Sequence, residues 1–192
     1  MNKNLEILAK TIKKNGCALI VEECEIITKS NSAGYFDIED GSPVIRIAKY
    51  GQSMLEFSQL LLHEYAHFLQ WKDGFLPAID DICDGWDILD RWLAGEEFGH
   101  EQLYVARNSI LLIEYDAEIR TVELAKKFHI NIGGASYFNN AHSYISSIKD
   151  AFRRRQWGQY TILNMHYRKL KPLELLAPLT PREIAKIEKG PA

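Results

Sequence analysis

The 192-residue sequence has few cysteines, no long hydrophobic run and no excess of basic residues. No apolar stretch approaches the roughly 18 residues that a membrane-spanning helix needs. Three cysteines, none in a C-x-x-C pair, are too few for a disulfide framework. The formal net charge of −3 is unlike that of a protein with a large basic surface for nucleic acid. We therefore expect neither a membrane protein, a disulfide-rich domain nor a nucleic-acid-binding protein.

The remaining composition, 46% hydrophobic and 26% charged, is that of an ordinary globular protein. A chain of this length can bury one proper core, so we expect a single domain over residues 1–192. Lysines and acidic residues interrupt the N-terminal hydrophobic pattern, which is typical of an amphipathic helix and not of a signal peptide. We accordingly expect a cytoplasmic protein with free thiols.

The pentapeptide His63-Glu64-Tyr65-Ala66-His67 has the H-E-x-x-H pattern of zinc metallopeptidases. Residues four apart lie on the same face of a helix, so His63 and His67 can direct two imidazoles at one metal ion. Glu64 lies beside them and can accept a proton from a metal-bound water. Roughly one or two chains per hundred of this composition would contain the pattern by chance. The neighbouring sequence must therefore show whether the motif forms a metal site.

The segment around this motif has the signals of a long, buried helix. Ser53 and Glu56 form a capping-box pattern, and Gly74 is typical of a position just past a helix end. We expect a helix over about residues 54–72, or 52–73 with its caps, with hydrophobic residues on more than one side. Two buried histidines and a glutamate are costly unless they are satisfied. A metal ion would satisfy them, and a hydrogen-bonded pair of core histidines is the alternative.

A catalytic zinc ion usually has three protein ligands, so the motif needs one more. A second helical pattern, predicted over residues 108–128 with Asn108 or Ser109 as its N-cap, places Glu114 directly after a run of apolar residues. We expect Glu114 to be the third metal ligand, with Asp116 and Glu118 as competitors. Glu118 follows one turn later, and we expect it to accept a hydrogen bond from the outer N–H of a ligand histidine.

These two segments resemble the gluzincin group of zinc peptidases, which carry H-E-x-x-H on one helix and a glutamate ligand on a later one. The string E-x-x-A, from Glu114 to Ala117, looks like the second signature of ImmA/IrrE-like peptidases. The chain is also similar to uncharacterised phage-encoded metallopeptidases with an "EYD" string in this place. The resemblance covers mainly residues 53–72 and 108–128.

The sequence departs from the ImmA/IrrE-like pattern in three ways. Glu118 replaces the usual Asn, Arg120-Thr121 replaces the usual "FA", and the stretch between the two signatures is longer. The resemblance implies a zincin-like α+β fold with one catalytic Zn²⁺ and a peptide or protein substrate.

The N-terminal part predicts a small sheet. Asp40-Gly41 between two short alternating runs is a strong hairpin signal, and a further β-rich run begins at Cys17. We expect a mostly antiparallel sheet packed on a mainly helical body, with the H-E-x-x-H helix in the core. In zincin-like folds a strand beside the cleft pairs with extended substrate, and the strand near residues 43–48 is the candidate. The alternative is an edge strand without this role.

Three further segments have marked charge patterns. Residues 73–101 are acidic with helical hydrophobic spacing, which favours a solvated acidic face over a lid or a site for a basic partner. A helix predicted over residues 136–157 ends in three arginines, which suit its dipole or pair with the acidic segment; contact with phosphate or an acidic peptide is the alternative. A capping box at Thr180 to Glu183 predicts a short last helix in a helical C-terminal part, 136–192.

The sequence thus predicts a zinc metallopeptidase in which Glu64 activates a water and His63, His67 and Glu114 hold the metal. The alternatives are a zinc-binding regulatory or interaction protein on the same scaffold, and a metal-free structural protein. Cys17 and Cys24 are a weaker alternative pair of zinc ligands. The sequence does not choose among the residues that could stabilise an oxyanion, which are Tyr137, His142, Tyr144 and Arg120.

Overall fold

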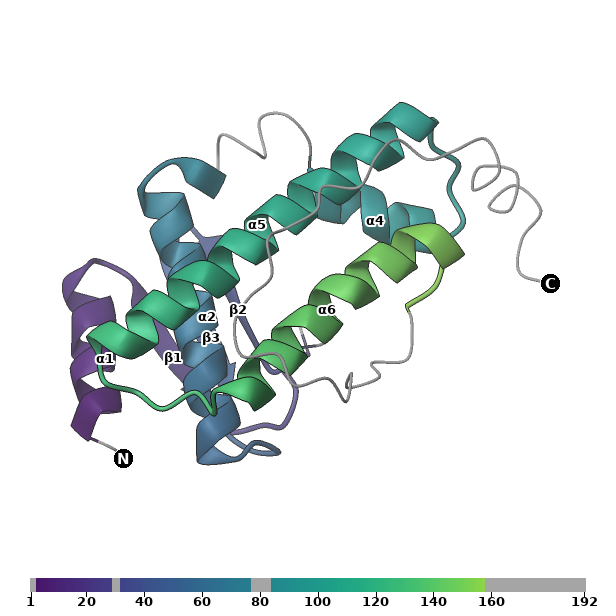
Figure 1. The fold of residues 1–192 in the computed structure, drawn as a ribbon. Helices are drawn as coiled ribbons and strands as arrows, with labels where there is room; N and C mark the ends of the chain where they lie inside the picture. Colours follow the sequence, from purple (N-terminus) through teal and green to yellow (C-terminus); the bar gives the residue numbers. More distant parts are fainter. Residues whose placement is uncertain (1–2, 29–31, 77–83, 158–192) are drawn as a thin grey trace. The chain divides into compact units, whose positions relative to one another are not determined.

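A computed structural model describes residues 3–28, 32–76 and 84–157. Over these residues the fold is α+β, as predicted, with five helices and one three-stranded sheet (Figure 1). The chain divides into two compact units, one within Met1–Phe75 and Ala117–Tyr137, the other within Leu76–Asp116 and Phe138–Ala192. None of the described helices is both long and apolar enough to cross a membrane.

The sheet belongs to the first unit and has the strand order β1-β3-β2. The predicted hairpin is confirmed, because Asp40 and Gly41 both have positive φ, at 50° and 77°, as a two-residue type I′ turn requires. The strands are β1 (Ala18–Glu22), β2 (Gly34–Glu39) and β3 (Ser42–Ala48).

The sheet is mixed, which corrects the prediction of a mostly antiparallel one. β3 pairs antiparallel with β2 but parallel with β1. β3 lies between β1 and β2, so the two outer strands do not pair with each other. The prediction that residues 43–48 form an edge strand able to pair with substrate is therefore wrong. β3 is the central strand because it has the most hydrophobic side chains to bury, namely Val44, Ile45, Ile47 and Ala48.

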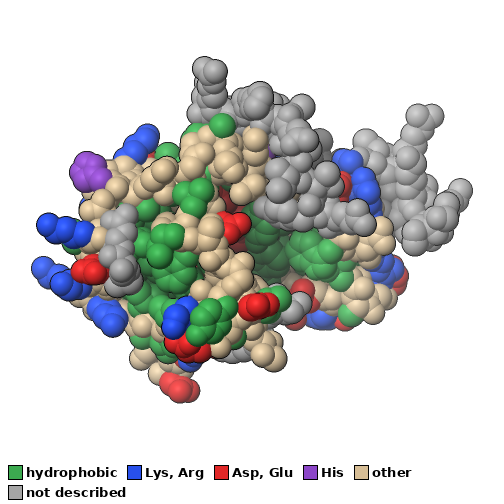
Figure 2. Space-filling model, turned by 90° about the horizontal axis from the view of Figure 1, so that it is seen from below, with side chains coloured by type: hydrophobic (Ala, Val, Ile, Leu, Met, Phe, Trp, Pro, Cys, Tyr) green, Lys and Arg blue, Asp and Glu red, His purple; other side chains and the backbone are tan. Residues whose placement is uncertain are grey.

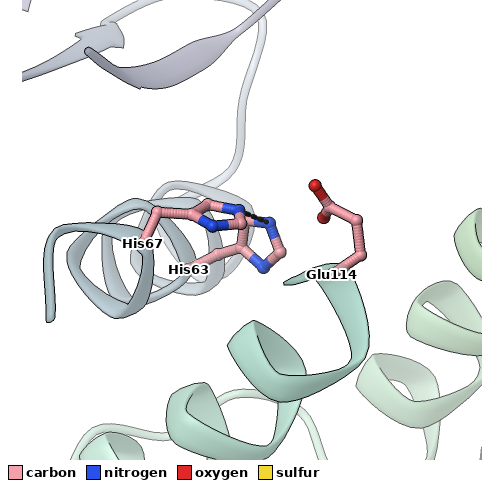
Figure 3. A group of neighbouring side chains, drawn as sticks. All are labelled: His63, His67 and Glu114. Carbon is pink, nitrogen blue, oxygen red and sulfur yellow. Dashed lines mark hydrogen bonds between the residues drawn. The ribbon is translucent and has the colours of Figure 1, made fainter. Parts of the chain in front are cut away.

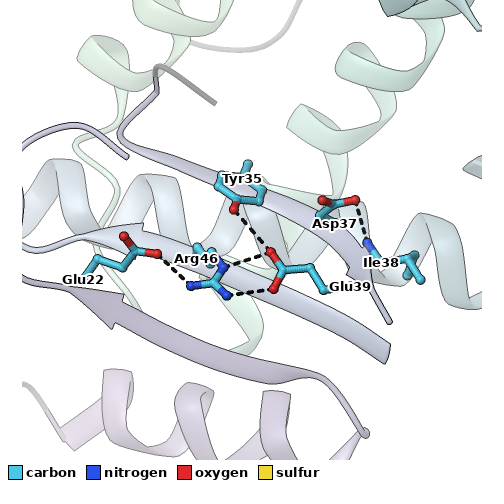
Figure 4. A network of polar contacts seen from close by, with 6 residues as sticks. All are labelled: Glu22, Tyr35, Asp37, Ile38, Glu39 and Arg46. Atoms are coloured by element: carbon cyan, nitrogen blue, oxygen red, sulfur yellow. Dashed lines mark hydrogen bonds and ion pairs between the residues drawn. The ribbon is translucent and has the colours of Figure 1, made fainter. Parts of the chain in front are cut away.

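One face of this sheet has a polar network centred on Arg46 of β3 (Figure 4). Its guanidinium pairs with Glu22 of β1 at 2.8 Å and with Glu39 of β2 at 2.7 Å. The Tyr35 hydroxyl donates a further hydrogen bond to Glu39, at 3.3 Å. The Arg46–Glu39 pair is bidentate and the Arg46 side chain is only 25% exposed, so the network contributes more than isolated surface ion pairs would. It also links both outer strands to the central one.

The opposite face of the sheet is covered by α2 (Met54–Lys72), which contacts β2 and β3. Side chains alternate between faces along a strand, so Phe36 and Ile45, which are paired, point away from Arg46. Phe36 contacts the ring of Phe68 in α2, with 6.0 Å between ring centroids. This contact makes α2 a core helix of the first unit.

The helix α1 (Lys3–Lys14) packs against β1 through Leu5, Leu8 and Ile12, which are buried. Its lysines lie on the outer face. Figure 2 shows Lys and Arg side chains along the left edge of the surface, the side on which α1 lies in Figure 1. The predicted amphipathic N-terminal helix is therefore confirmed.

The ends of α2 match the sequence prediction. Ser53 Oγ accepts a hydrogen bond from the Glu56 backbone N–H at 3.2 Å, and the Glu56 carboxylate accepts one from the Ser53 N–H at 2.8 Å. Asp73 is the C-cap, and Gly74 follows with a φ of 80°. These caps fix where α2 begins and ends, and therefore where the two histidines lie along it.

The second unit contains α4 (Gly85–Leu93), the first part of α5 (His100–Lys127) and most of α6 (Ala135–Arg154). The predicted cap of α5 at Asn108 or Ser109 is wrong, since both residues lie inside the helix. Ser109 Oγ instead donates to the Val105 carbonyl at 2.9 Å. The apolar pattern extends further back than predicted, and its buried members in α5 include Leu103, Ala106 and Ile110. The helix predicted over residues 136–157 corresponds to α6, whose buried side chains include Ala141, Ile145, Ile148 and Phe152.

Part of the acidic segment pairs with the basic end of α6, as one of the two favoured interpretations predicted. Arg155 contacts Glu97 at 2.6 Å and lies 4.1 Å from the centroid of the Trp92 ring. Within the acidic segment, Arg91 pairs with Asp87 and Glu96. The predictions for Cys83 and for the capping box at residues 180–183 lie outside the described residues.

Replacing Ser53 with Ala should lower the free energy of unfolding by about 1 kcal/mol, because the first turn of α2 loses its side-chain cap. Urea unfolding measures this loss. Ser146→Ala, at an exposed position inside α6, is the matched control and should have no destabilising effect. An equal loss in both variants would show that the capping box contributes nothing specific.

Candidate metal centre

The two histidines of α2 lie one turn apart on the same side of the helix (Figure 3). Their rings are nearly perpendicular, at 87°, with 4.7 Å between centroids. The Nε2 atoms of His63 and His67 are 3.1 Å apart. Two imidazole nitrogens bound to one tetrahedral zinc ion, at 2.0–2.1 Å each, would be about 3.3 Å apart. The spacing therefore fits two ligands of one ion.

The other ring nitrogen of each histidine faces an oxygen acceptor. His67 Nδ1 lies 2.8 Å from the side-chain oxygen of Gln70, which is fully buried one turn along α2. His63 Nδ1 lies 3.5 Å from Oε1 of Glu118, on the part of α5 that belongs to the first unit. A carboxylate and an amide oxygen act as acceptors, so both contacts favour the tautomer that has its proton on Nδ1.

This arrangement leaves the Nε2 lone pairs of both rings directed at each other. Two acceptor nitrogens 3.1 Å apart repel unless a cation lies at the place where they converge. A shared proton or a metal ion can supply that charge. Metal-binding histidines commonly have their outer N–H held by a carboxylate or carbonyl, as both rings do here. The donor set therefore fits a metal.

Glu114 completes a group of three. The helix α5 runs without a break from Glu118 back through Glu114, one turn away and on the same face. His63, His67 and Glu114 each offer one ligand atom, and these atoms lie within 4.8 Å of one another. In Figure 3 the Glu114 carboxylate lies on the side of the paired ring nitrogens. The group could hold a metal ion, and Asp116 is not part of it.

The other residues of the motif face inward. Glu64 is 6% exposed and follows His63 directly on α2. Tyr65 points to α1, where its hydroxyl accepts a 3.1 Å hydrogen bond from Asn15, and burial raises its pKa. Tyr65 thus contributes to the packing of α1 on α2 and not to the metal group.

Sequence reasoning missed two partners of this site. Gln70 lies at the i+3 position from His67, a helical spacing that could have identified it. Tyr137 donates a hydrogen bond to Oε2 of Glu118, and no local pattern links these two residues. Burial and the adjacent Glu118 carboxylate raise the pKa of Tyr137 well above its usual range.

Two of the four candidates for oxyanion stabilisation, Tyr137 and Arg120, lie in the first unit. Tyr137 donates to Glu118, and Arg120 pairs with Asp73 at 2.5 Å. His142 and Tyr144 lie on α6 in the second unit.

The two described cysteines are free thiols outside the three-residue group. Cys17 is buried, and burial raises its pKa to about 11. A metal binds the thiolate form, which this environment disfavours. The histidine pair is therefore a better metal site than Cys17 with Cys24.

No family model, curated protein or solved structure matches this chain.

The purified protein should bind one zinc ion per chain, and His63→Ala or His67→Ala should reduce this to near zero because each removes a nitrogen ligand. Elemental analysis after growth with zinc measures the content. His100→Ala, at an exposed histidine, is the control and should keep its zinc. A wild-type content far below one per chain would contradict the metal site. Zinc retained in Glu114→Gln but lost in Glu118→Gln would mean that Glu118 is the third ligand.

Proposed function

We propose that this protein is a zinc-dependent hydrolase with a zincin-like fold, and that it cleaves peptide bonds. The convergence of the His63 and His67 Nε2 atoms, each ring held from behind by an acceptor, is the observation that carries the proposal. Glu114 supplies an oxygen ligand. Two nitrogens and one carboxylate make the donor set of catalytic zinc sites, which leave one position open, and differ from the four-ligand sets of structural sites.

The chain's own residues have distinct tasks in this proposal. Zinc, when bound, lowers the pKa of its water to about 7 and polarises the substrate carbonyl. Glu64 accepts the proton of the attacking water and later donates it to the leaving amine. Gln70 and Glu118 keep both Nδ1 atoms protonated, so that both Nε2 lone pairs remain available. The Glu114 carboxylate offsets part of the charge of the metal.

The choice of a peptide bond rests on the resemblance of the two helical segments to zinc peptidases. The α+β fold, with α2 in the core beside a small sheet, is compatible with it. A zinc-binding regulatory protein would use the same ligands without needing Glu64 as a base, and this difference separates the two functions.

Glu64→Gln should keep its zinc and lose at least about 100-fold in cleavage rate, because the amide cannot accept the proton of the water. Proteins from a host expressing the wild type or the variant can be compared for new N-termini, which also identifies the substrate. Glu123→Gln, at an exposed position of α5, is the matched control and should cleave normally.

Normal cleavage by Glu64→Gln would contradict the assigned base. Zinc binding by both proteins, with cleavage by neither, would favour a zinc-binding regulatory function.

A further inference from the structure

Both carboxylate oxygens of Glu118 have a side-chain partner. Oε1 lies 3.5 Å from His63 Nδ1, and Oε2 accepts the hydrogen bond from the Tyr137 hydroxyl. Glu118 and Tyr137 are each only 5% exposed. Water therefore has little access to this carboxylate, and its orientation depends on both contacts.

We propose that Tyr137 is a positioning residue of the metal site, which holds Glu118 so that Glu118 holds the ring of His63. The proposal rests on the zinc site proposed above. With both its oxygens engaged, Glu118 stays behind His63, and Glu114, one turn earlier on α5, is left to bind the metal. Glu114 and Glu118 lie on one face of α5. Tyr137 thereby helps to keep Glu118 as the partner of His63 and Glu114 as the metal ligand.

The position of Tyr137 is itself tied to the helix that carries the histidines. Residues 133 and 134 are glycines with positive φ, at 79° and 53°, and form the turn before α6. Gln59 of α2 donates to the Ile132 carbonyl at 2.7 Å, just before this turn. A Cβ on Gly133 would lie 3.1 Å from the Leu55 side chain of α2. The close approach holds the start of α6 against α2, and Tyr137 lies in the first turn of α6.

The hydrogen bond from Tyr137 to Glu118 should be strong. A neutral phenol donates to a carboxylate in a site closed to solvent, where charge-assisted hydrogen bonds are strongest. Removing the hydroxyl leaves Oε2 of Glu118 without this donor, and the carboxylate can then rotate away from His63. The metal should bind more weakly although none of its ligands has changed.

Tyr137→Phe tests the proposal because it removes one oxygen and keeps the ring. Zinc affinity, measured by competition with a chromophoric chelator, should fall about 10-fold or more. Tyr104→Phe, also on a helix, is the matched control and should bind zinc like the wild type. Circular dichroism of both variants confirms that they are folded.

A double-mutant cycle separates positioning from a merely structural effect. If Tyr137 acts through Glu118, then Glu118→Gln should weaken zinc binding, and adding Tyr137→Phe to it should cost much less than in the wild type. Equal affinities of Tyr137→Phe and Tyr104→Phe, or independent costs of the two changes, would overturn the inference and leave the zinc site standing. A wild type that binds no zinc would overturn the proposed function and this inference together.

Discussion

The arrangement of the candidate site depends on one constraint: two imidazole rings on adjacent turns of a core helix direct their Nε2 atoms to the same point. At 3.1 Å these nitrogens can remain together only with a cation or a shared proton between them. Gln70 and Glu118 take the other ring nitrogens and so favour the metal. A metal ion at this point would account for the placement of Glu114, the burial of Glu64 and the contact of Tyr137 with Glu118.

Within the first unit α2 is packed on two sides, and this packing holds the two histidine rings in place. The sheet packs against it through Phe36 and Phe68, while Asn15, directly after α1, donates a hydrogen bond to Tyr65 of α2. The capping box at Ser53 sets where the helix begins, and the turn at residues 133–134 places Tyr137 behind Glu118. A histidine pair on a less firmly packed helix could separate to relieve the repulsion, and metal affinity would fall accordingly.

Much of this could be predicted from the sequence, because its signals are local. The capping box, the Asp-Gly hairpin and the i,i+4 spacing each depend on residues close in the chain, and Glu114 was identified from a carboxylate that follows an apolar run. The parallel pairing of β1 with β3 was missed because strand order depends on contacts distant in sequence. Tyr137 was considered only as an oxyanion donor, since its contact with Glu118 joins two helices. The start of α5 was misplaced because Asn108 and Ser109 resemble caps but lie within a longer apolar stripe.

The most direct test of the account is the protonation of the two rings when zinc is bound. Long-range ¹H–¹⁵N NMR spectra at about pH 8, where free imidazole is neutral, distinguish Nδ1 from Nε2. In a titration to one equivalent of zinc, His63 and His67 should both keep a protonated Nδ1, and both Nε2 signals should shift to those of metal-bound nitrogen. A ring that keeps its proton on Nε2, or spectra that zinc leaves unchanged, would contradict the account.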